Sequence, residues 1–176
     1  NPGATKVILN GPRMGITHVT GDQGKRLESK RSKGGYDAYP YLTQFGYQHE
    51  VQYLNAVSFQ AVFEMIGMIS GLDQELFIPS LTLMNGFRNN KFGFEFAFGP
   101  SFSLATKAKG YYADGTWYLA HEWSSKDQNG NPISNPNELV YRLDNRGGVK
   151  LSSGFVWAVG KTFKSGHLNI PVNAYV

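Results

Sequence analysis

Five runs of this sequence place an apolar residue at every second position over about nine to fifteen residues. In the run 92–104, for example, Phe94, Phe96 and Phe98 alternate with small or polar residues. A period of two is typical of a β-strand, because successive side chains of a strand point to opposite faces of its sheet. Strands in soluble domains average about five or six residues. The alternation therefore predicts an all-β chain with unusually long strands.

Two weaker runs bring the expected number of strands to seven. In order, they are Val7–Val19, Tyr41–Tyr53, Val57–Ile69, Phe77–Phe87, Phe92–Leu104, Val149–Phe163 and Leu168–Val176. Short turns and longer connections alternate between them, and the long connections include 20–38 and 105–148. This order predicts an up-and-down antiparallel sheet with tight turns at one end and long loops at the other. We find no internal repeat, so residues 1–176 are expected to form a single domain.

Hairpin pairing is consistent with the alternation. Folding the chain at Asn55 places Val51 opposite Phe59, and Gly46 opposite Glu64. Folding it near residues 89–90 sets Leu83 against Phe96 in the same way. In each hairpin apolar meets apolar, which is what a sheet with two different faces requires.

The apolar face has two interpretations. In a soluble barrel it forms the core, whereas in an outer-membrane barrel it contacts lipid and the polar face fills the interior. Here the polar face consists mainly of Gly, Ala, Ser, Gln and Asn with few charges, which suits a narrow barrel interior. Thirteen residues at a tilt of ~40° span roughly 33 Å, more than the ~25 Å apolar band of such barrels. The strand length and the polar face favour the membrane.

Aromatic residues and charge spacing agree with this interpretation. Aromatics cluster near the ends of the expected strands, as in interfacial girdles; they are Tyr39, Tyr41, Tyr53, Phe87, Phe92, Phe102, Trp157 and Tyr175. The longest stretch without a charged residue has only 13 residues, 51–63, which excludes a membrane-spanning helix.

The two faces give two sets of candidate residues. Polar residues expected to plug the interior are Gln44, Gln48, Glu50, Glu64, Glu95 and Lys150. Residues expected to face lipid are Phe45, Phe59, Phe63, Phe94, Phe96, Phe98, Trp157 and Val159. Buried carboxylates need cationic partners, which Arg13, Arg88 or Lys150 can supply. The same groups also suit a proton or solute path, but an open pore is not expected in a barrel of about eight strands.

Seven strands are one short of an even number, and bacterial single-chain barrels close with an even number. Either part of 105–148 joins the wall, or a final strand lies beyond Val176. We favour the second, because 116–123 and 139–143 suit a short protruding hairpin. The first residue is Asn1, with no Met or signal segment before it, so we expect a mature chain after removal of a signal peptide.

Several short motifs carry a resemblance to a known family. They are Thr43-Gln44-Phe45-Gly46-Tyr47-Gln48, Gly71-Leu72-Asp73-Gln74, Ile78-Pro79-Ser80, Gly86-Phe87-Arg88, Gly99-Pro100 and Leu168-Asn169-Ile170-Pro171-Val172-Asn173. Through them the chain resembles the small, roughly eight-stranded outer-membrane β-barrels of Gram-negative bacteria, within a group that has no known activity. The resemblance covers most of the wall but not 105–148. It implies an up-and-down antiparallel transmembrane β-barrel of about eight strands in the bacterial outer membrane, and a last strand after Val176.

Three loop motifs suggest chemistry. His121, Glu122 and Ser124 bring the groups of a hydrolase together, although neighbours on a strand face opposite ways. The oxygen-bearing residues Asp127, Asn129, Asn131 and Glu138 imitate the spacing of a calcium loop, but Pro132 stands where that loop needs Gly. A basic loop suited to phosphate groups or an acidic partner contains Lys25, Arg26, Lys30, Arg31 and Lys33. The sequence has no Cys, and its four His show no paired metal spacing.

The expected function is therefore non-enzymatic. A barrel without an open pore would present loops 20–38 and 105–148 outside the cell to lipopolysaccharide or to another outer-membrane protein, with outer-membrane lipid around its wall. We expect no cofactor, no metal and no nucleic acid, since a net charge of +4 is a mild excess. The alternatives are a surface lipid-modifying hydrolase and a soluble lipocalin-like barrel that binds a small apolar ligand.

Overall fold

The computed structural model describes residues 9–124, 126–127, 129–165 and 168–176. It is an all-β structure of mostly antiparallel strands in a curled half-barrel sheet. The strands are β1 (Gly11–His18), β2 (Tyr41–Asn55), β3 (Phe59–Ser70), β4 (Ile78–Asn89), β5 (Phe94–Ala113), β6 (Thr116–Leu119), β7 (Val140–Leu143), β8 (Gly148–Ser165) and β9 (Leu168–Tyr175). The helical elements are α1 (Gly21–Glu28), η1 (Arg31–Lys33), η2 (Leu72–Gln74) and η3 (Ala120–Glu122).

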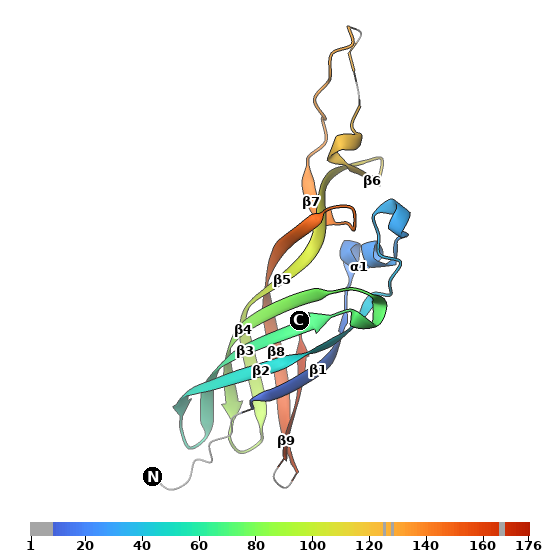
Figure 1. Cartoon of the computed structure of the whole chain (residues 1–176). Helices are drawn as coiled ribbons and strands as arrows, with labels where there is room; N and C mark the ends of the chain where they lie inside the picture. Colours follow the sequence, from blue (N-terminus) through green and yellow to red (C-terminus); the bar gives the residue numbers. More distant parts are fainter. Residues whose placement is uncertain (1–8, 125, 128, 166–167) are drawn as a thin grey trace. The chain divides into compact units, whose positions relative to one another are not determined.

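The chain divides into two compact units. The first contains residues 1–17, 42–104 and 151–176, and the second contains residues 18–41 and 105–150. In the first unit the strand order is β1-β2-β3-β4-β5-β8-β9, so neighbours in the sequence are neighbours in the sheet apart from the step from β5 to β8 (Figure 1). Within the described part of the chain, β1 and β9 each pair on one side only.

Each of the seven expected strands has a counterpart in the structure, with shifted ends; residues 7–8 of the expected strand Val7–Val19 lie outside the described residues. The register of the hairpins differs from the expected one. Val51 pairs with Phe63 rather than Phe59, and Gly46 pairs with Met68 rather than Glu64. The reason lies in the turn, where the Ala56 amide donates to the Phe59 carbonyl and an irregularity falls between residues 52 and 54.

The β4–β5 hairpin is shifted for a similar reason. Asn85 pairs with Phe98, so the expected pairing of Leu83 with Phe96 is wrong. The Asn89 side chain accepts hydrogen bonds from the amides of Lys91 and Phe92, which fixes a wider turn. In both hairpins the shift is an even number of residues, so each side chain keeps its expected face.

The two faces of the wall differ as the alternation requires. On the inward face, a buried apolar layer consists of Ile66, Met84, Ala97 and Ala158. On the opposite face, rings of Phe96, Phe98, Phe155 and Trp157 contact one another and remain partly exposed. Aromatic side chains of adjacent strands therefore pack on the outside of the sheet, while small and polar groups fill its inside.

The second unit is built on the last residues of β5. Tyr112 pairs with Trp117 on β6, and Lys109 pairs with Tyr141 on β7. The expected hairpin made from 116–123 and 139–143 is therefore wrong, because each of the two segments pairs with β5 and not with the other. Residues 20–38, expected as a loop, contain the short helix α1, which contacts β7.

None of the helices among the described residues has the length and apolar character needed to cross a membrane.

Candidate functional site

A buried charged cluster occupies the inward face of β2, β3, β4 and β5. It consists of Glu50, Glu64, Arg88 and Glu95. The strand register assembles it: Glu50 pairs with Glu64 across β2 and β3, and Arg88 pairs with Glu95 across β4 and β5. The side chains of directly paired residues lie on the same face, so the four charges converge.

Arg88 is the cation that joins two of the carboxylates. Its Nε donates to Glu95 Oε2 at 2.6 Å, and its Nη1 donates to Glu50 Oε1 at 2.9 Å. Its Nη2 lies 2.5 Å from Glu50 Oε2 and 2.6 Å from Glu95 Oε2. Arg88 is only 3% exposed, so these are desolvated, charge-assisted contacts that join β2, β4 and β5.

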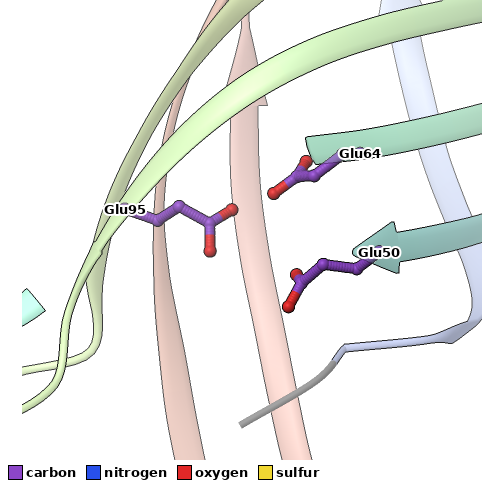
Figure 2. Close-up of side chains that lie close together, drawn as sticks. All are labelled: Glu50, Glu64 and Glu95. Carbon is purple, nitrogen blue, oxygen red and sulfur yellow. The ribbon is translucent and has the colours of Figure 1, made fainter. Parts of the chain in front are cut away.

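Glu64 is the member of the cluster without a donor. Its side chain is 0% exposed, and neither carboxylate oxygen receives a hydrogen bond from a group in the described residues. Figure 2 shows its carboxylate directed toward those of Glu50 and Glu95. Gly86 leaves the space for it, because a Cβ at that position would lie 3.2 Å from Glu64 Oε1.

The segment around β1 completes the polar interior. Arg13 Nε donates to Gln48 Oε1 at 2.8 Å, and Gln48 is fully buried. The backbone amide of Leu9 lies 3.4 Å from Glu50 Oε1, and the Glu50 amide donates to Asn10 Oδ1. Hydrogen bonds thus connect β1 and the residues before it to the same inward face of β2.

The three carboxylates satisfy the distance criterion for a cation site, since one oxygen from each lies within 4.8 Å of the others. However, the Arg88 guanidinium already donates hydrogen bonds to Glu50 and Glu95. The arrangement is therefore an ion-pair network with one surplus carboxylate. Chemically, its ion pairs can bridge β2, β4 and β5, and Glu64 on β3 can accept a further positive charge.

The residues expected in the interior are divided between the two units. Gln48, Glu50, Glu64 and Glu95 lie buried in the first unit, and Gln44 is half-buried there with its amide donating to the Ser70 hydroxyl. Lys150 is not brought to them: it is an exposed residue of the second unit, with its Nζ 5.3 Å from the centre of the Tyr141 ring. Arg88, considered only as one possible counter-ion, is the central residue of the cluster.

The residues expected to face lipid all lie on exposed or half-buried positions. Phe45, Phe59, Phe94, Phe96, Trp157 and Val159 are exposed, and Phe63 and Phe98 are half-buried. Phe96 is 41% exposed and Trp157 is 52% exposed, although their ring centres lie only 5.7 Å apart. Large aromatic groups therefore stand outside this sheet as a contiguous patch.

The expected basic loop is folded against the second unit. Lys25, Lys30, Arg31 and Lys33 are exposed, whereas Arg26 is half-buried with its guanidinium over the Trp117 ring. Loop 20–38 is held further by Tyr36, whose hydroxyl donates to the Thr106 carbonyl, and by an ion pair of 2.7 Å between Asp22 and Arg142. The loop thus carries exposed cations on a defined scaffold, and the Arg31 Nε donates back to the Tyr36 carbonyl.

The second unit contains a buried acid, Asp144, that was not anticipated from the sequence. Its carboxylate accepts hydrogen bonds from Arg146 and from Trp117 Nε1, and the Asn145 amide next to it donates to the Gly34 carbonyl. Burial opposes ionisation, but the hydrogen bonds from Arg146 and Trp117 outweigh it and hold the pKa of Asp144 below its ordinary value. The Asp144-Asn145-Arg146-Gly147 turn resembled an ordinary loop, so no sequence signal marked it.

The other loop motifs have structural contacts. Glu122 accepts a hydrogen bond from the Leu119 amide, and its carboxylate lies 3.7 Å from Arg146 Nη1. The carboxylate therefore binds these two groups and is not used to orient His121. Asp127 accepts hydrogen bonds from the amides of Asn129 and Asn131, which is the geometry of a side-chain-stabilised turn.

A scan against protein-family models, a search of curated proteins and a search of solved structures each found no match to this chain.

Proposed function

We propose that this chain is an outer-membrane β-barrel of a Gram-negative bacterium, with a closed interior, that presents loops 20–38 and 105–148 to a partner at the cell surface. The observation that carries the proposal is the inverted distribution of side chains in the wall. Phe94, Phe96 and Trp157 are exposed, while Glu64 and Arg88 are buried. A soluble sheet places these classes of side chain the other way round, whereas a sheet in lipid requires this arrangement.

The membrane proposal includes the closure of the sheet. In the described part of the chain, β1 and β9 each pair on one side only, which leaves backbone groups that lipid cannot satisfy. We propose that one further strand lies between β1 and β9 and gives the even number of strands usual in bacterial barrels.

The interior cluster supports a closed barrel over a pore. Arg88 bridges Glu50 and Glu95 across the inward face, and Met84 and Glu64 beside it are fully buried. An open channel would need mobile, hydrated side chains in place of these desolvated ion pairs. The function then lies in the loops, where Lys25, Lys30, Arg31 and Lys33 offer exposed cations to phosphate groups of lipopolysaccharide or to an acidic protein.

The alternatives receive less support. A soluble lipocalin-like barrel needs Phe94 and Phe96 inside, but both are exposed. A lipid-modifying hydrolase needs Glu122 to orient His121, but Glu122 is bound to Leu119 and paired with Arg146.

Heat-modifiability tests the proposal. The chain is refolded in detergent and run on a gel with and without boiling. We expect the unboiled band to migrate faster and to show β-rich circular dichroism, because closed membrane barrels resist detergent until heated. A protein that stays monomeric in buffer without detergent and shows no shift would contradict the proposal.

A further inference from the structure

We propose that the buried carboxyl groups of Glu64 and Glu95 bind one proton between them and form a hydrogen-bonded acid–carboxylate pair inside the sheet. This inference goes beyond the proposed function, because it concerns the interior and is independent of what the loops bind. It rests on the register, the burial and the contacts of four side chains.

The first argument is the supply of hydrogen-bond donors. Glu50 and Glu95 each accept hydrogen bonds from the Arg88 guanidinium. Glu64 receives none from the groups that the structure describes, although its two oxygens are buried. An oxygen of the Glu95 carboxyl lies within 4.8 Å of a Glu64 oxygen, and Figure 2 shows the two carboxyl groups facing each other. Two ionised carboxylates have no hydrogen between them, and one proton would supply the missing donor.

The second argument is the balance of charge. Glu64 interacts electrostatically with Glu50 on β2, Arg88 on β4 and Glu95 on β5. Its paired residue on β2 is Glu50, and its paired residue on β4 is the uncharged Met84. On the two outer strands, Tyr175 of β9 interacts electrostatically with Glu64, Glu95 and Arg13 of β1. Arg13 donates to Gln48, and Arg88 pairs with Glu50 and Glu95, so among the described residues one guanidinium is paired within a group of three carboxylates. Buried charge is stable only when it is compensated, and one bound proton removes part of the excess.

The third argument distinguishes a proton from a metal ion. Ca²⁺ takes about six to eight oxygen ligands, and Mg²⁺ demands near-ideal octahedral geometry. Here the Arg88 guanidinium occupies Glu50 and Glu95 and would repel a second cation. Packing around Glu64 is close, because a Cβ at Gly86 would lie 2.9 Å from Val62 Cγ2 and 3.2 Å from Glu64 Oε1. A proton needs no ligand shell and no added volume.

Infrared spectroscopy of the folded chain in detergent at neutral pH tests the proposal directly. A protonated carboxyl group has a carbonyl stretching band that ionised carboxylates lack, and the band shifts in D₂O. We expect this band in the native protein. Glu64→Gln should remove it, because the amide supplies the missing hydrogen to Glu95, and Glu95→Gln should remove it for the converse reason. The matched control is Glu138→Gln, an exposed position where the band should persist at full area.

The outcomes are distinct. A native protein without the band would overturn the proposal whatever the variants do. A band that survives in both Glu64→Gln and Glu95→Gln would also overturn it, because the proton would then reside elsewhere. Circular dichroism of each sample shows that it is folded, and the gel shift of the same samples reports membrane-barrel behaviour separately.

Discussion

Glu50 and Glu64 are direct partners across β2 and β3, so two carboxylates stand opposite each other on a buried face. Like charges in this position normally weaken a sheet. The pair is tolerated because Arg88, two strands away from Glu50, reaches across to hold both Glu50 and Glu95. The Arg88 guanidinium therefore compensates the negative charge of both Glu50 and Glu95 in the interior.

Arg88→Met is expected to destabilise the first unit by about 3–5 kcal/mol, because it leaves buried carboxylates without their cation. The measurement is urea-induced unfolding of the refolded protein, followed by tryptophan fluorescence. Lys91→Met is the control: this side chain lies on an exposed turn, and its removal should change stability by less than about 0.5 kcal/mol. Equal effects at the two positions would mean that the Arg88 network contributes nothing specific.

Phe96→Arg tests the outer face of the wall. A new cation that faces lipid should cost about 2–4 kcal/mol of folding stability at the bilayer midplane and about 0–1 kcal/mol near the interface. We therefore expect Phe96→Arg to prevent folding into vesicles and Phe92→Arg, in the β4–β5 turn, to fold normally. The fraction of heat-modifiable protein after refolding gives the result. If both variants fold equally well, Phe96 does not contact lipid.

Gly34→Ala tests how residues 20–38 dock in the second unit. Gly34 has a φ of 79°, and a Cβ there would lie within 3 Å of the Asp144 carboxylate. Gly115 has a similar φ of 73°, but a Cβ there would have no neighbouring atom within 4 Å. Gly115→Ala therefore incurs the backbone strain alone. Such strain costs of order 1–3 kcal/mol. We expect proteolysis after Lys30 and Lys33 to accelerate far more in Gly34→Ala, and equal rates would contradict docking through Asp144.

Lowering the pH should weaken the docking of residues 20–38 next to Asp144. The pKa of Asp144 is held below its ordinary value, so its contribution to stability is fully present above the unfolded value of about 3.9 and is lost as the pH falls below it. We expect amide hydrogen exchange in 29–37 to rise, relative to the intrinsic rate, as the pH falls from about 5 to about 2.5.

Asp144→Asn is the variant that checks the assignment. It should show fast exchange in 29–37 already at pH 5 and little further change in acid. Asp127→Asn serves as its control, because the Asp127 turn lies in an exposed part of the loop and has its own local hydrogen bonds. A native acid response in Asp144→Asn would assign the effect to another group.

The alternation of residues predicted the long strands and the face of each side chain, because the two faces of a strand are a local property with a period of two. The register could not be obtained in the same way. Folding at residues 89–90 would set Arg88 against Lys91, whereas the Asn89 side chain fixes a wider turn and sets Arg88 against Glu95. An even shift preserves the faces but changes every partner.

The alternation also predicted that Glu50, Glu64 and Glu95 share one face with small and polar residues, and that Phe94, Phe96 and Phe98 share the other. Which groups meet follows from the three-dimensional pairing of the strands. Arg88 binds two of the three acids, Glu64 has no hydrogen-bond donor among the described residues, and Asp144 joins Arg146 and Trp117 in the second unit. These contacts depend on turn geometry and on pairing between distant segments, and a local hydrophobic pattern contains neither.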